Sequence, residues 1–381
     1  MFCTYLNNSY HFTYDNVKPC CWIKDSPRTQ IRITDPELKE KFSVLRQIDD
    51  WIPECNYCQD LEIAGTSSPR TLSDVNHVFT DKDTDTVRVE LQIDDDCNAA
   101  CLICGAWNSS TWRQYEERTL KGKTYPSYKW KTTVDERISV VKDLVSFDSV
   151  KQLHFFGGEP FNTDTQLTFL KLIEHPESVN IIYITNGSIF PCSETIELWK
   201  RFKSVHIGIS IDGVGDHFNY LRWPLQWHQI ENNLKKYVEL AVDNITINSS
   251  FTVTPFNIFY IDRYTQWAEE FSMKYDNNSD RISEWFLNPH PVVGSNMDMS
   301  CIPPDLKEMI IYKYGKDSRI SKILSTDFDV QKCLRMINYL NFHDRHRKSN
   351  WTEIFPEIVE YFDIDRLSPL PKKRVWEIKA V

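Results

Sequence analysis

Glycine is scarce in this sequence, with 11 residues among 381, against a usual share of about 7%. The few glycines therefore merit inspection, since glycine serves where the chain turns with a positive φ or passes close to other backbone. No run of 18 apolar residues occurs, which excludes a membrane-spanning helix. The first twelve residues lack a basic segment followed by an apolar one, so we expect no signal peptide and a cytoplasmic protein.

Basic residues are outnumbered by acidic ones, 44 to 54, so the net charge is −10. This balance disfavours nucleic acid as a partner, because phosphate binding requires a basic surface. Apolar residues make up 41% of the chain and aromatic residues 13%, which suffices for a sizeable core and excludes global disorder. At about 150 residues per domain, the length predicts two to three domains.

The chain has eleven cysteines, and this odd number excludes complete disulfide pairing within one chain. Their share is far below the about 8–10% of a disulfide scaffold. Eight lie in the first 104 residues: Cys3, Cys20, Cys21, Cys55, Cys58, Cys97, Cys101 and Cys104. In a reducing compartment such crowding indicates metal or redox chemistry.

Two cysteine spacings carry this interpretation. Cys55 and Cys58 form a CxxC, which is typical of zinc ribbons, thioredoxin-like sites and iron–sulfur clusters alike. Cys97, Cys101 and Cys104 form a CxxxCxxC, whose thiolates can surround one iron–sulfur cube and leave one metal vertex open. A structural zinc site would require a fourth ligand, and the next ten residues contain no Cys, His, Asp or Glu. A zinc knuckle or buried thiols are the alternatives.

After about residue 85, strand-like runs alternate with helical periodicity. The predicted strands are Val87–Ile93, Gln152–Phe156, Asn180–Thr185, Val205–Ile211, Ile245–Thr254 and Glu284–Asn288. The predicted helices between them include Val134–Val145, Gln166–Glu174, Ser193–Lys203 and Gln229–Val242. Six such units predict an α/β fold with a parallel sheet, a partial (β/α)6 TIM-like barrel whose chemistry lies at the carboxyl ends of the strands.

We expect three parts. Residues 1–84 would be a small cysteine-rich domain stabilised by a metal, with strands at Tyr10–Tyr14 and Gln30–Ile33 and a helix at about Pro36–Ile48. Residues 85–295 would be the barrel, and residues 296–381 a C-terminal helical extension.

Polar and glycine-containing motifs follow the predicted strands. They are Gly157-Gly158-Glu159-Pro160 after the second strand, Thr185-Asn186-Gly187 after the third, and Ser210-Ile211-Asp212-Gly213 after the fourth, with Arg222 soon afterwards. Together with the CxxxCxxC after the first strand, they resemble the radical S-adenosylmethionine (SAM) enzymes over about residues 87–290. The order and the strand context of four motifs agree, which makes the joint occurrence specific.

The resemblance implies a [4Fe–4S] cluster on Cys97, Cys101 and Cys104, with SAM chelating the fourth iron. One electron, from an external donor such as flavodoxin or ferredoxin, would cleave SAM to methionine and a 5′-deoxyadenosyl radical that abstracts a substrate hydrogen. The residue before the third cysteine is usually aromatic in this family, and here it is Ile103.

The resemblance also implies a set of SAM-binding residues. Gly157 and Gly158 would let SAM approach the strand end, and Glu159 would accept hydrogen bonds from its amino group. The remaining residues would bind ribose hydroxyls and the SAM carboxylate: Asn186, Ser210, Asp212 and Arg222. Ordinary strand-end turn chemistry is the alternative for Asn186, Ser210 and Asp212, and a surface ion pair is the alternative for Arg222.

The first 84 residues add a second resemblance, to the SPASM/twitch-like accessory domains of some radical SAM proteins. It implies an auxiliary iron–sulfur cluster, a [4Fe–4S] cluster being favoured, on Cys3, Cys20, Cys55 and Cys58, and Cys21 could replace Cys20. Structural zinc is the alternative, because four thiolates suit both metals.

By analogy, the accessory domain favours a peptide or protein substrate that is crosslinked, epimerised or otherwise oxidised. A small metabolite, nucleotide or sugar is the alternative, and a metal-bound protein without catalysis is the alternative of another class. Cys301, in a loop after the sixth predicted strand, could donate a hydrogen atom to a substrate radical. His154 lies within a strand, where we expect a core histidine with its hydrogen bonds satisfied.

Overall fold

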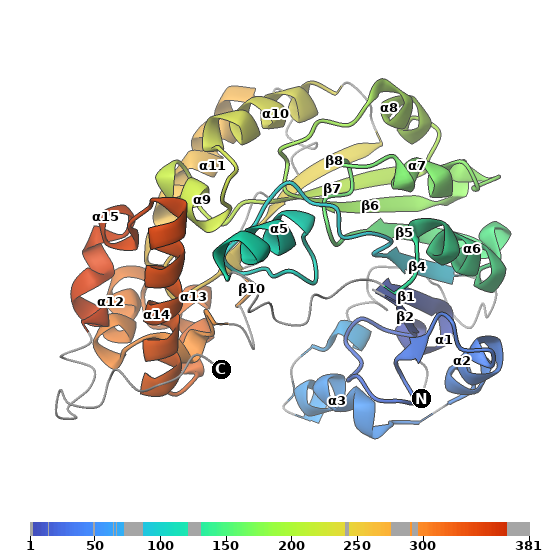
Figure 1. Cartoon of the computed structure of the whole chain (residues 1–381), viewed down its shortest axis with the longest axis horizontal. Coiled ribbons are helices and arrows are strands. Elements are labelled where there is room, and N and C mark those ends of the chain that lie inside the picture. Colours follow the sequence, from blue (N-terminus) through green and yellow to red (C-terminus); the bar gives the residue numbers. More distant parts are fainter. Residues whose placement is uncertain are drawn as a thin grey trace.

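The computed structural model shows one sheet flanked by helices (Figure 1). It describes residues 3–13, 15–48, 50–63, 65, 67–71, 87–120, 131–240, 244–275, 290–291 and 296–363. The strands are β1 (Ser9–Thr13), β2 (Asn16–Lys18), β3 (Ile31–Arg32), β4 (Val87–Leu91), β5 (Val150–Phe155), β6 (Asn180–Thr185), β7 (Ser204–Ser210), β8 (Ile245–Ser250), β9 (Thr252–Val253) and β10 (His290–Pro291).

The strands of the described residues form an eight-stranded sheet, in the order β3-β2-β1-β4-β5-β6-β7-β8, and a small pair, β10-β9. β1 and β4 to β8 are parallel, while β2 and β3 are antiparallel additions at one edge. The predicted α/β class with a mostly parallel sheet is confirmed.

Five of the six predicted barrel strands are confirmed, and Asn180–Thr185 matches β6 at both ends. The fifth is divided at Phe251 into β8 and β9. The sixth, Glu284–Asn288, lies outside the described residues. The next described residues, His290–Pro291, pair in parallel with β9, so the parallel order continues past β8.

The helices follow the strands as the periodicity predicts. They are α1 (Thr4–Asn8), α2 (Leu38–Arg46), α3 (Asn56–Ile63), α5 (Ser110–Thr119), α6 (Val134–Leu144), α7 (Thr165–Leu170), α8 (Ser193–Trp199), α9 (Asp216–Leu221), α10 (Trp227–Glu239), α11 (Ile261–Tyr275), α12 (Pro304–Tyr314), α13 (Arg319–Lys322), α14 (Val330–Arg347) and α15 (Trp351–Ile354). Short 3-10 turns lie at 53–55, 147–149, 176–178, 258–260, 299–301, 323–325 and 356–362. None of the helices in the described part has the length and apolar character to span a membrane.

Alternation along the strands separates an apolar face of the sheet from a polar one. In β7 the fully buried Val205, Ile207 and Ile209 alternate with more polar positions. Tyr183 of β6 lies on the same apolar face, where its hydroxyl accepts a hydrogen bond from Trp199 Nε1 at the end of α8. The helices therefore cover the apolar face, and the opposite face carries polar side chains near the candidate site.

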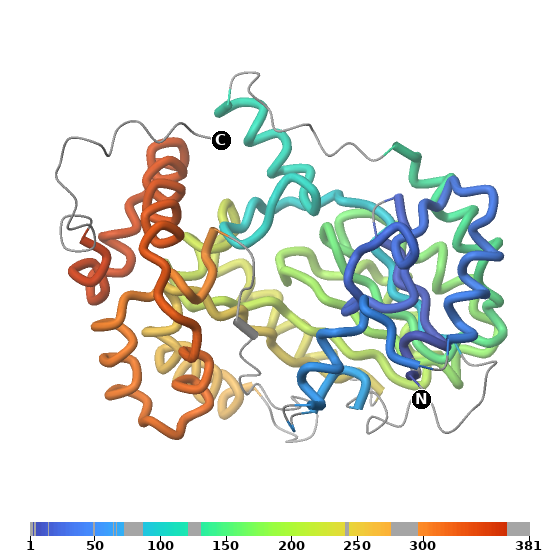
Figure 2. Tube along the Cα trace, turned by 90° about the horizontal axis from the view of Figure 1, so that it is seen from below, coloured from blue at the N-terminus to red at the C-terminus, as the bar shows by residue number. Residues whose placement is uncertain are grey.

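The N-terminal segment extends the barrel sheet. β1 pairs in parallel with β4, and its Tyr10 and Phe12 are buried in the same core as the barrel strands. The Tyr10 ring stacks on Phe42 of α2, with centroids 4.8 Å apart. Helices α12 to α15 lie at the other end of the molecule (Figures 1 and 2). The division of the chain at residues 84 and 295 stays a prediction.

The shared core gives a stability test. Phe12→Ala should lower the free energy of unfolding by about 3–5 kcal/mol, because it opens a cavity beside β4. The exposed Ile63 is the control, and Ile63→Ala should change it by less than about 0.5 kcal/mol. Calorimetry should show one transition shifted as a whole. A separate early transition of the N-terminal part would contradict the shared core.

Candidate active site

Cys97, Cys101 and Cys104 lie in the loop after β4, and Cys97 is six residues beyond the end of that strand. Cys97 and Cys101 are buried and Cys104 is half-buried. The start of α5 holds the loop: Thr111 Oγ1 donates to the Cys97 carbonyl oxygen (2.6 Å), and Trp112 Nε1 donates to that of Cys101 (2.8 Å). The three thiols are thus presented from one braced loop.

The C-terminal helix α14 braces the same loop from another direction. Arg347 Nη2 donates to the Ala100 carbonyl oxygen (2.9 Å), and the Tyr339 hydroxyl to that of Leu102 (3.1 Å). The Arg347 guanidinium also lies about 5 Å from the rings of Trp112, Tyr115 and Trp223. Sequence reasoning missed both α14 residues. They are eight residues apart and so lie on one face of the helix, but the sequence pattern does not indicate which loop they contact.

Gly157 and Gly158 bring the end of β5 against the cysteine loop. Both have positive φ, +74° and +46°. A Cβ on Gly158 would come within 2.7 Å of the Asp96 carbonyl oxygen. That oxygen accepts a hydrogen bond from the backbone N–H of Glu159 (2.8 Å). Glycine is therefore required here for both conformation and space.

Glu159 ties two strand ends together. It is 1% exposed. Its Oε1 accepts a hydrogen bond from Thr185 Oγ1 (2.6 Å), and its Oε2 accepts one from the backbone N–H of Asn186 (2.7 Å). Burial raises the pKa of this carboxyl to about 7, although the hydrogen bonds act in the opposite direction. Glu159 is therefore a buried structural carboxyl and not a solvated acid of a loop.

Asn186 links the end of β6 to the cysteine motif. Its Nδ2 donates to Asn98 Oδ1 (2.9 Å) and lies 4.0 Å from Cys97 Sγ. Ser188 completes the group, since its hydroxyl donates to Asn186 Oδ1 (2.5 Å) and accepts from Asn98 Nδ2 (2.9 Å). Asn98 and Ser188 were missed, and their only signal was adjacency to Cys97 and Asn186. Ser210 lies half-buried at the end of β7.

Asp212 and Arg222 form a buried ion pair, with Oδ2 and Nη2 2.8 Å apart. Asp212 Oδ1 also accepts a hydrogen bond from the backbone N–H of Thr252 (2.9 Å). Arg222 Nη1 lies 4.0 Å from Cys101 Sγ. The guanidinium therefore connects the end of β7 to the cysteine loop, and the alternative of a surface ion pair is wrong for Arg222.

The electrostatics of the loop suit a positively charged group. Burial raises the pKa of all three thiols, that of Cys104 to about 12, and neighbouring thiolates raise those of Cys97 and Cys104 further. Arg222 acts in the opposite direction and lowers the pKa of Cys101 and Cys104. Iron would add further positive charge beside the three thiolates, so the donor set fits an iron–sulfur cluster.

A second group of thiols meets in the N-terminal part. Cys3, Cys20, Cys55 and Cys58 line one small cavity together with Arg70. Burial, and next the neighbouring Cys3, raises the pKa of Cys55 to about 11. Among the described residues around this cavity Cys21 does not appear, and its thiol lies instead beside His11 and Glu90. The donor set fits a four-thiolate metal site.

Cys301 lies in the turn at 299–301 and is 1% exposed. Burial raises the pKa of its thiol to about 12. Burial, and next the neighbouring Cys301, also raises the pKa of Cys333 in α14. A hydrogen donor must reach the substrate, so this role would require the turn to move. The role of Cys301 stays a prediction.

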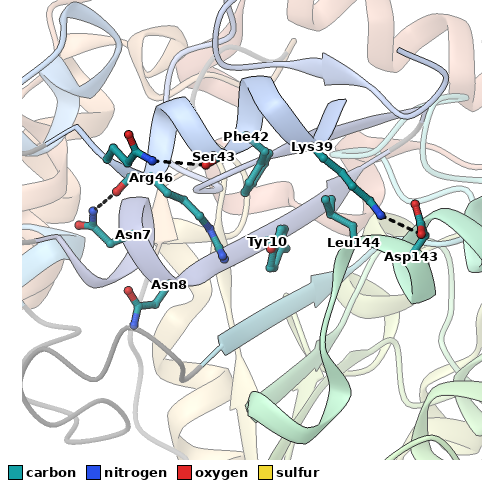
Figure 3. A pocket seen from close by; sticks show the side chains of 10 residues that line it. Asn7, Asn8, Tyr10, Lys39, Phe42, Ser43, Arg46, Asp143 and Leu144 are labelled. Atoms are coloured by element: carbon teal, nitrogen blue, oxygen red, sulfur yellow. Dashed lines mark hydrogen bonds and ion pairs between the residues drawn. The ribbon is translucent and has the colours of Figure 1, made fainter. Parts of the chain in front are cut away.

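A cavity of about 770 Å³ is lined by none of these cysteines (Figure 3). It is lined by residues of α1, α2, β1 and α6, and the Lys39–Asp143 ion pair (2.9 Å) crosses its edge. It contributes no residue to the candidate site.

The fold and the site together define an α/β domain with a three-cysteine loop at the carboxyl end of a parallel sheet. Residues 92–260 match the family described as the Radical SAM superfamily. This segment is therefore similar to the radical SAM domain over the region that holds the three cysteines and the strand-end motifs. This match confirms the resemblance over the barrel segment.

Solved structures show weaker likeness. One is anSMEcpe with bound AdoMet, at 15% identity and a TM-score of 0.38, covering 63% of this chain and 60% of that one. Another is Streptococcus suis SuiB bound to S-adenosylmethionine, at 13% identity and a TM-score of 0.36, covering 78% and 61%. The chain thus spans about three fifths of the length of these structures. No curated protein matches the sequence.

The buried ion pair yields a matched test. Arg222→Gln should lower the free energy of unfolding by about 3–5 kcal/mol, because Asp212 is left buried without its counter-charge. Arg263→Gln is the control, since it breaks the half-exposed pair with Glu357 and should cost less than about 1 kcal/mol. Urea unfolding measures both. Equal losses would show that Asp212 has another compensating partner.

Proposed function

We propose that this chain reductively cleaves SAM and abstracts a hydrogen atom from its substrate, with Cys97, Cys101 and Cys104 holding a [4Fe–4S] cluster. One observation carries the proposal: within the radical SAM domain, three cysteines of one braced loop lie against the Gly157–Gly158 turn at the end of the next strand. With SAM bound, the cluster supplies the electron that the cleavage requires.

The residues proposed to bind SAM fall into two groups. Gly157 and Gly158 keep the strand end free of side chains, and Asn186 and Ser210 offer polar groups at neighbouring strand ends. In the second group are Glu159, Asp212 and Arg222. Glu159 bonds Thr185 at the end of β6, and Asp212 bonds both Thr252 and Arg222. Their contribution is to hold the rim of the site rigid while they contact SAM.

The four N-terminal thiols are proposed to hold an auxiliary cluster of the SPASM/twitch kind. The shared cavity of Cys3, Cys20, Cys55 and Cys58 supports this assignment. Four thiolates also suit structural zinc, which is the alternative. In either case the metal would join α1, the segment after β2, and α3.

The proposed substrate is a peptide or protein, which would be crosslinked, epimerised or otherwise oxidised. The support is the accessory-cysteine pattern, an argument by analogy. A flavodoxin- or ferredoxin-like protein is the proposed electron donor. A small metabolite, nucleotide or sugar is the alternative substrate. Mass spectrometry of candidate peptides after turnover in D2O distinguishes loss of hydrogen from deuterium incorporation.

SAM cleavage is the direct test of the catalytic site. After anaerobic reconstitution, the protein with dithionite and SAM should form 5′-deoxyadenosine and methionine. Cys104→Ala should abolish this product, because only two ligands remain for the cluster. Cys192→Ala, a change at an exposed cysteine, should leave it unchanged. A wild-type protein that holds a [4Fe–4S] cluster yet forms no 5′-deoxyadenosine would be a binding protein without this activity.

Iron content tests the auxiliary site separately. Reconstituted protein should hold about eight iron atoms per chain, the content of two cubane clusters. Cys55→Ala should hold about four, and it should still cleave SAM. About four iron atoms and one zinc in the wild type would favour structural zinc.

A further inference from the structure

A polar row crosses the face of the sheet opposite the helices. The strand register aligns His11 of β1 with Glu90 of β4, and Glu90 with His154 of β5. Their neighbours Tyr10 and Phe12 lie on the apolar face, where Tyr10 packs on α2. Since side chains alternate along a strand, the two histidines and the glutamate share the opposite face.

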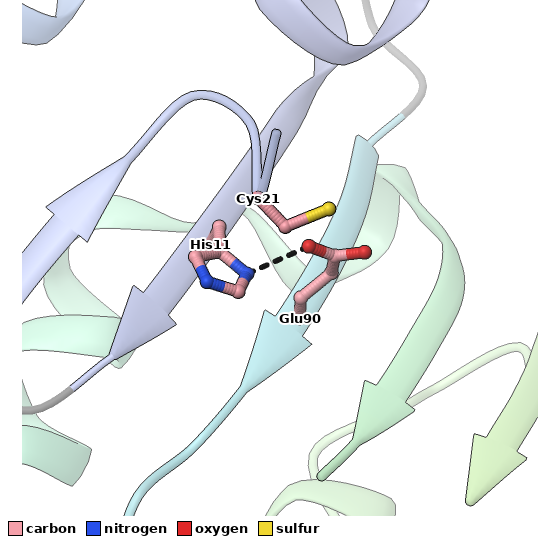
Figure 4. Close-up of side chains that lie close together, drawn as sticks. All are labelled: His11, Cys21 and Glu90. Carbon is pink, nitrogen blue, oxygen red and sulfur yellow. Dashed lines mark hydrogen bonds and ion pairs between the residues drawn. The ribbon is translucent and has the colours of Figure 1, made fainter. Parts of the chain in front are cut away.

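Cys21 approaches this row from the segment after β2. One donor atom each from His11, Cys21 and Glu90 lies within 4.8 Å of the other two (Figure 4). His11 Nδ1 is 2.7 Å from Glu90 Oε2. His11 and Glu90 are buried and Cys21 is half-buried. An imidazole, a thiol and a carboxylate from three separate segments therefore converge on one point.

We propose that His11 Nδ1, Cys21 Sγ and Glu90 Oε2 bind a divalent transition-metal ion, zinc best fitting the donor set. Nitrogen, sulfur and oxygen donors are the usual zinc ligands, and a tetrahedral ion would hold them about 3.3–3.8 Å apart. The ion would take the place of the hydrogen shared between His11 and Glu90, and small side-chain movements would complete the geometry.

The second oxygen of Glu90 is occupied by protein. Arg88 Nη2 lies 2.6 Å from Oε1, and the Arg88 guanidinium also stacks on Tyr5. This bond orients the carboxylate so that Oε2 points to His11 and Cys21. Second-sphere hydrogen bonds of this kind orient metal ligands in proteins.

His154 provides an independent observation. Its Nδ1 is 3.6 Å from Glu90 Oε1, too long for a hydrogen bond. Both ring nitrogens are buried, and neither has a hydrogen-bond partner among the described residues. The expectation of a satisfied core histidine is therefore wrong. His154 lies with Arg88 on the Oε1 side of Glu90, so it belongs to the groups around the carboxylate that would orient Oε2 toward the ion. Three protein ligands leave one position for water.

This site differs from the two cysteine groups already described. Cys21 was the alternative to Cys20 in the auxiliary cluster. Cys20 lines the four-thiol cavity and Cys21 lies beside His11 and Glu90, and the two neighbouring thiols also contact each other. The proposal does not depend on SAM cleavage, so failure of that activity would leave it standing.

The experiment uses the full chain loaded with iron and sulfide, incubated with zinc chloride and then desalted. Elemental analysis should find about one zinc per chain. Zinc X-ray absorption should show one sulfur neighbour and otherwise nitrogen and oxygen. Four sulfur neighbours would place zinc at the four-thiol cavity, and no retained zinc would show a metal-free ion-pair network; either result overturns the proposal.

Variants assign the ligands. Cys21→Ser and His11→Asn should bind zinc at least about 100-fold more weakly than the wild type, and His154→Phe about 10–100-fold more weakly, all with unchanged iron. The exposed Cys192→Ser and His175→Ala are matched controls and should retain zinc. Zinc retained undiminished by Cys21→Ser overturns the proposal. Should a variant lose iron as well, the absorption spectrum of the wild type alone decides between one and four sulfur neighbours.

Discussion

The hydrogen bond from the Glu159 N–H to the Asp96 carbonyl oxygen is the contact on which the candidate active site depends. It joins the end of β5 to the residue just before Cys97, and it forms only because Gly158 carries no Cβ. Once the two segments touch, the Glu159 carboxylate can reach Thr185 and Asn186 at the next strand end. Asn186 in turn reaches Asn98 within the cysteine motif. The contacts form a closed circuit around the loop, so none of its members is positioned by its own strand alone.

The parallel sheet and its strand-end motifs could be predicted from the sequence because each depends on local information. The pattern of apolar residues identifies a buried strand. The residues that follow a parallel strand lie at the carboxyl edge of the sheet, independently of distant contacts. Reasoning of this kind predicted that the three cysteines, Gly157 to Glu159, and Asn186 lie at the ends of strands. It also found the Asp212–Arg222 neighbourhood, although not the pairing itself, which depends on how the short helix α9 turns the chain.

What could not be predicted depends on contacts between distant segments. Tyr339 and Arg347 brace Ala100 and Leu102 across more than 230 residues, and no pattern in α14 indicates that partner. The same holds for β1. Its parallel pairing with β4 aligns His11 with Glu90 across 79 residues, and a shift of one residue would have sent His11 to the apolar face. The N-terminal segment therefore extends the barrel sheet through a pairing that no local pattern indicates.

The adjacent Cys20 and Cys21 have different neighbours, because Cys20 lines the four-thiol cavity and Cys21 lies beside His11 and Glu90. Both follow β2, whose pairing with β1 determines where the chain leaves the sheet. Glu90 is a buried carboxyl beside the place where the chain leaves the sheet. Burial alone would raise the pKa of its carboxyl, but His11, His154 and the Arg88 guanidinium hold it well below its usual value. A buried carboxylate beside a thiol is unfavourable unless positive charge lies nearby. Arg88 and the two histidines provide that stabilisation from within the protein, which keeps the Glu90 carboxyl ionised and available as a ligand.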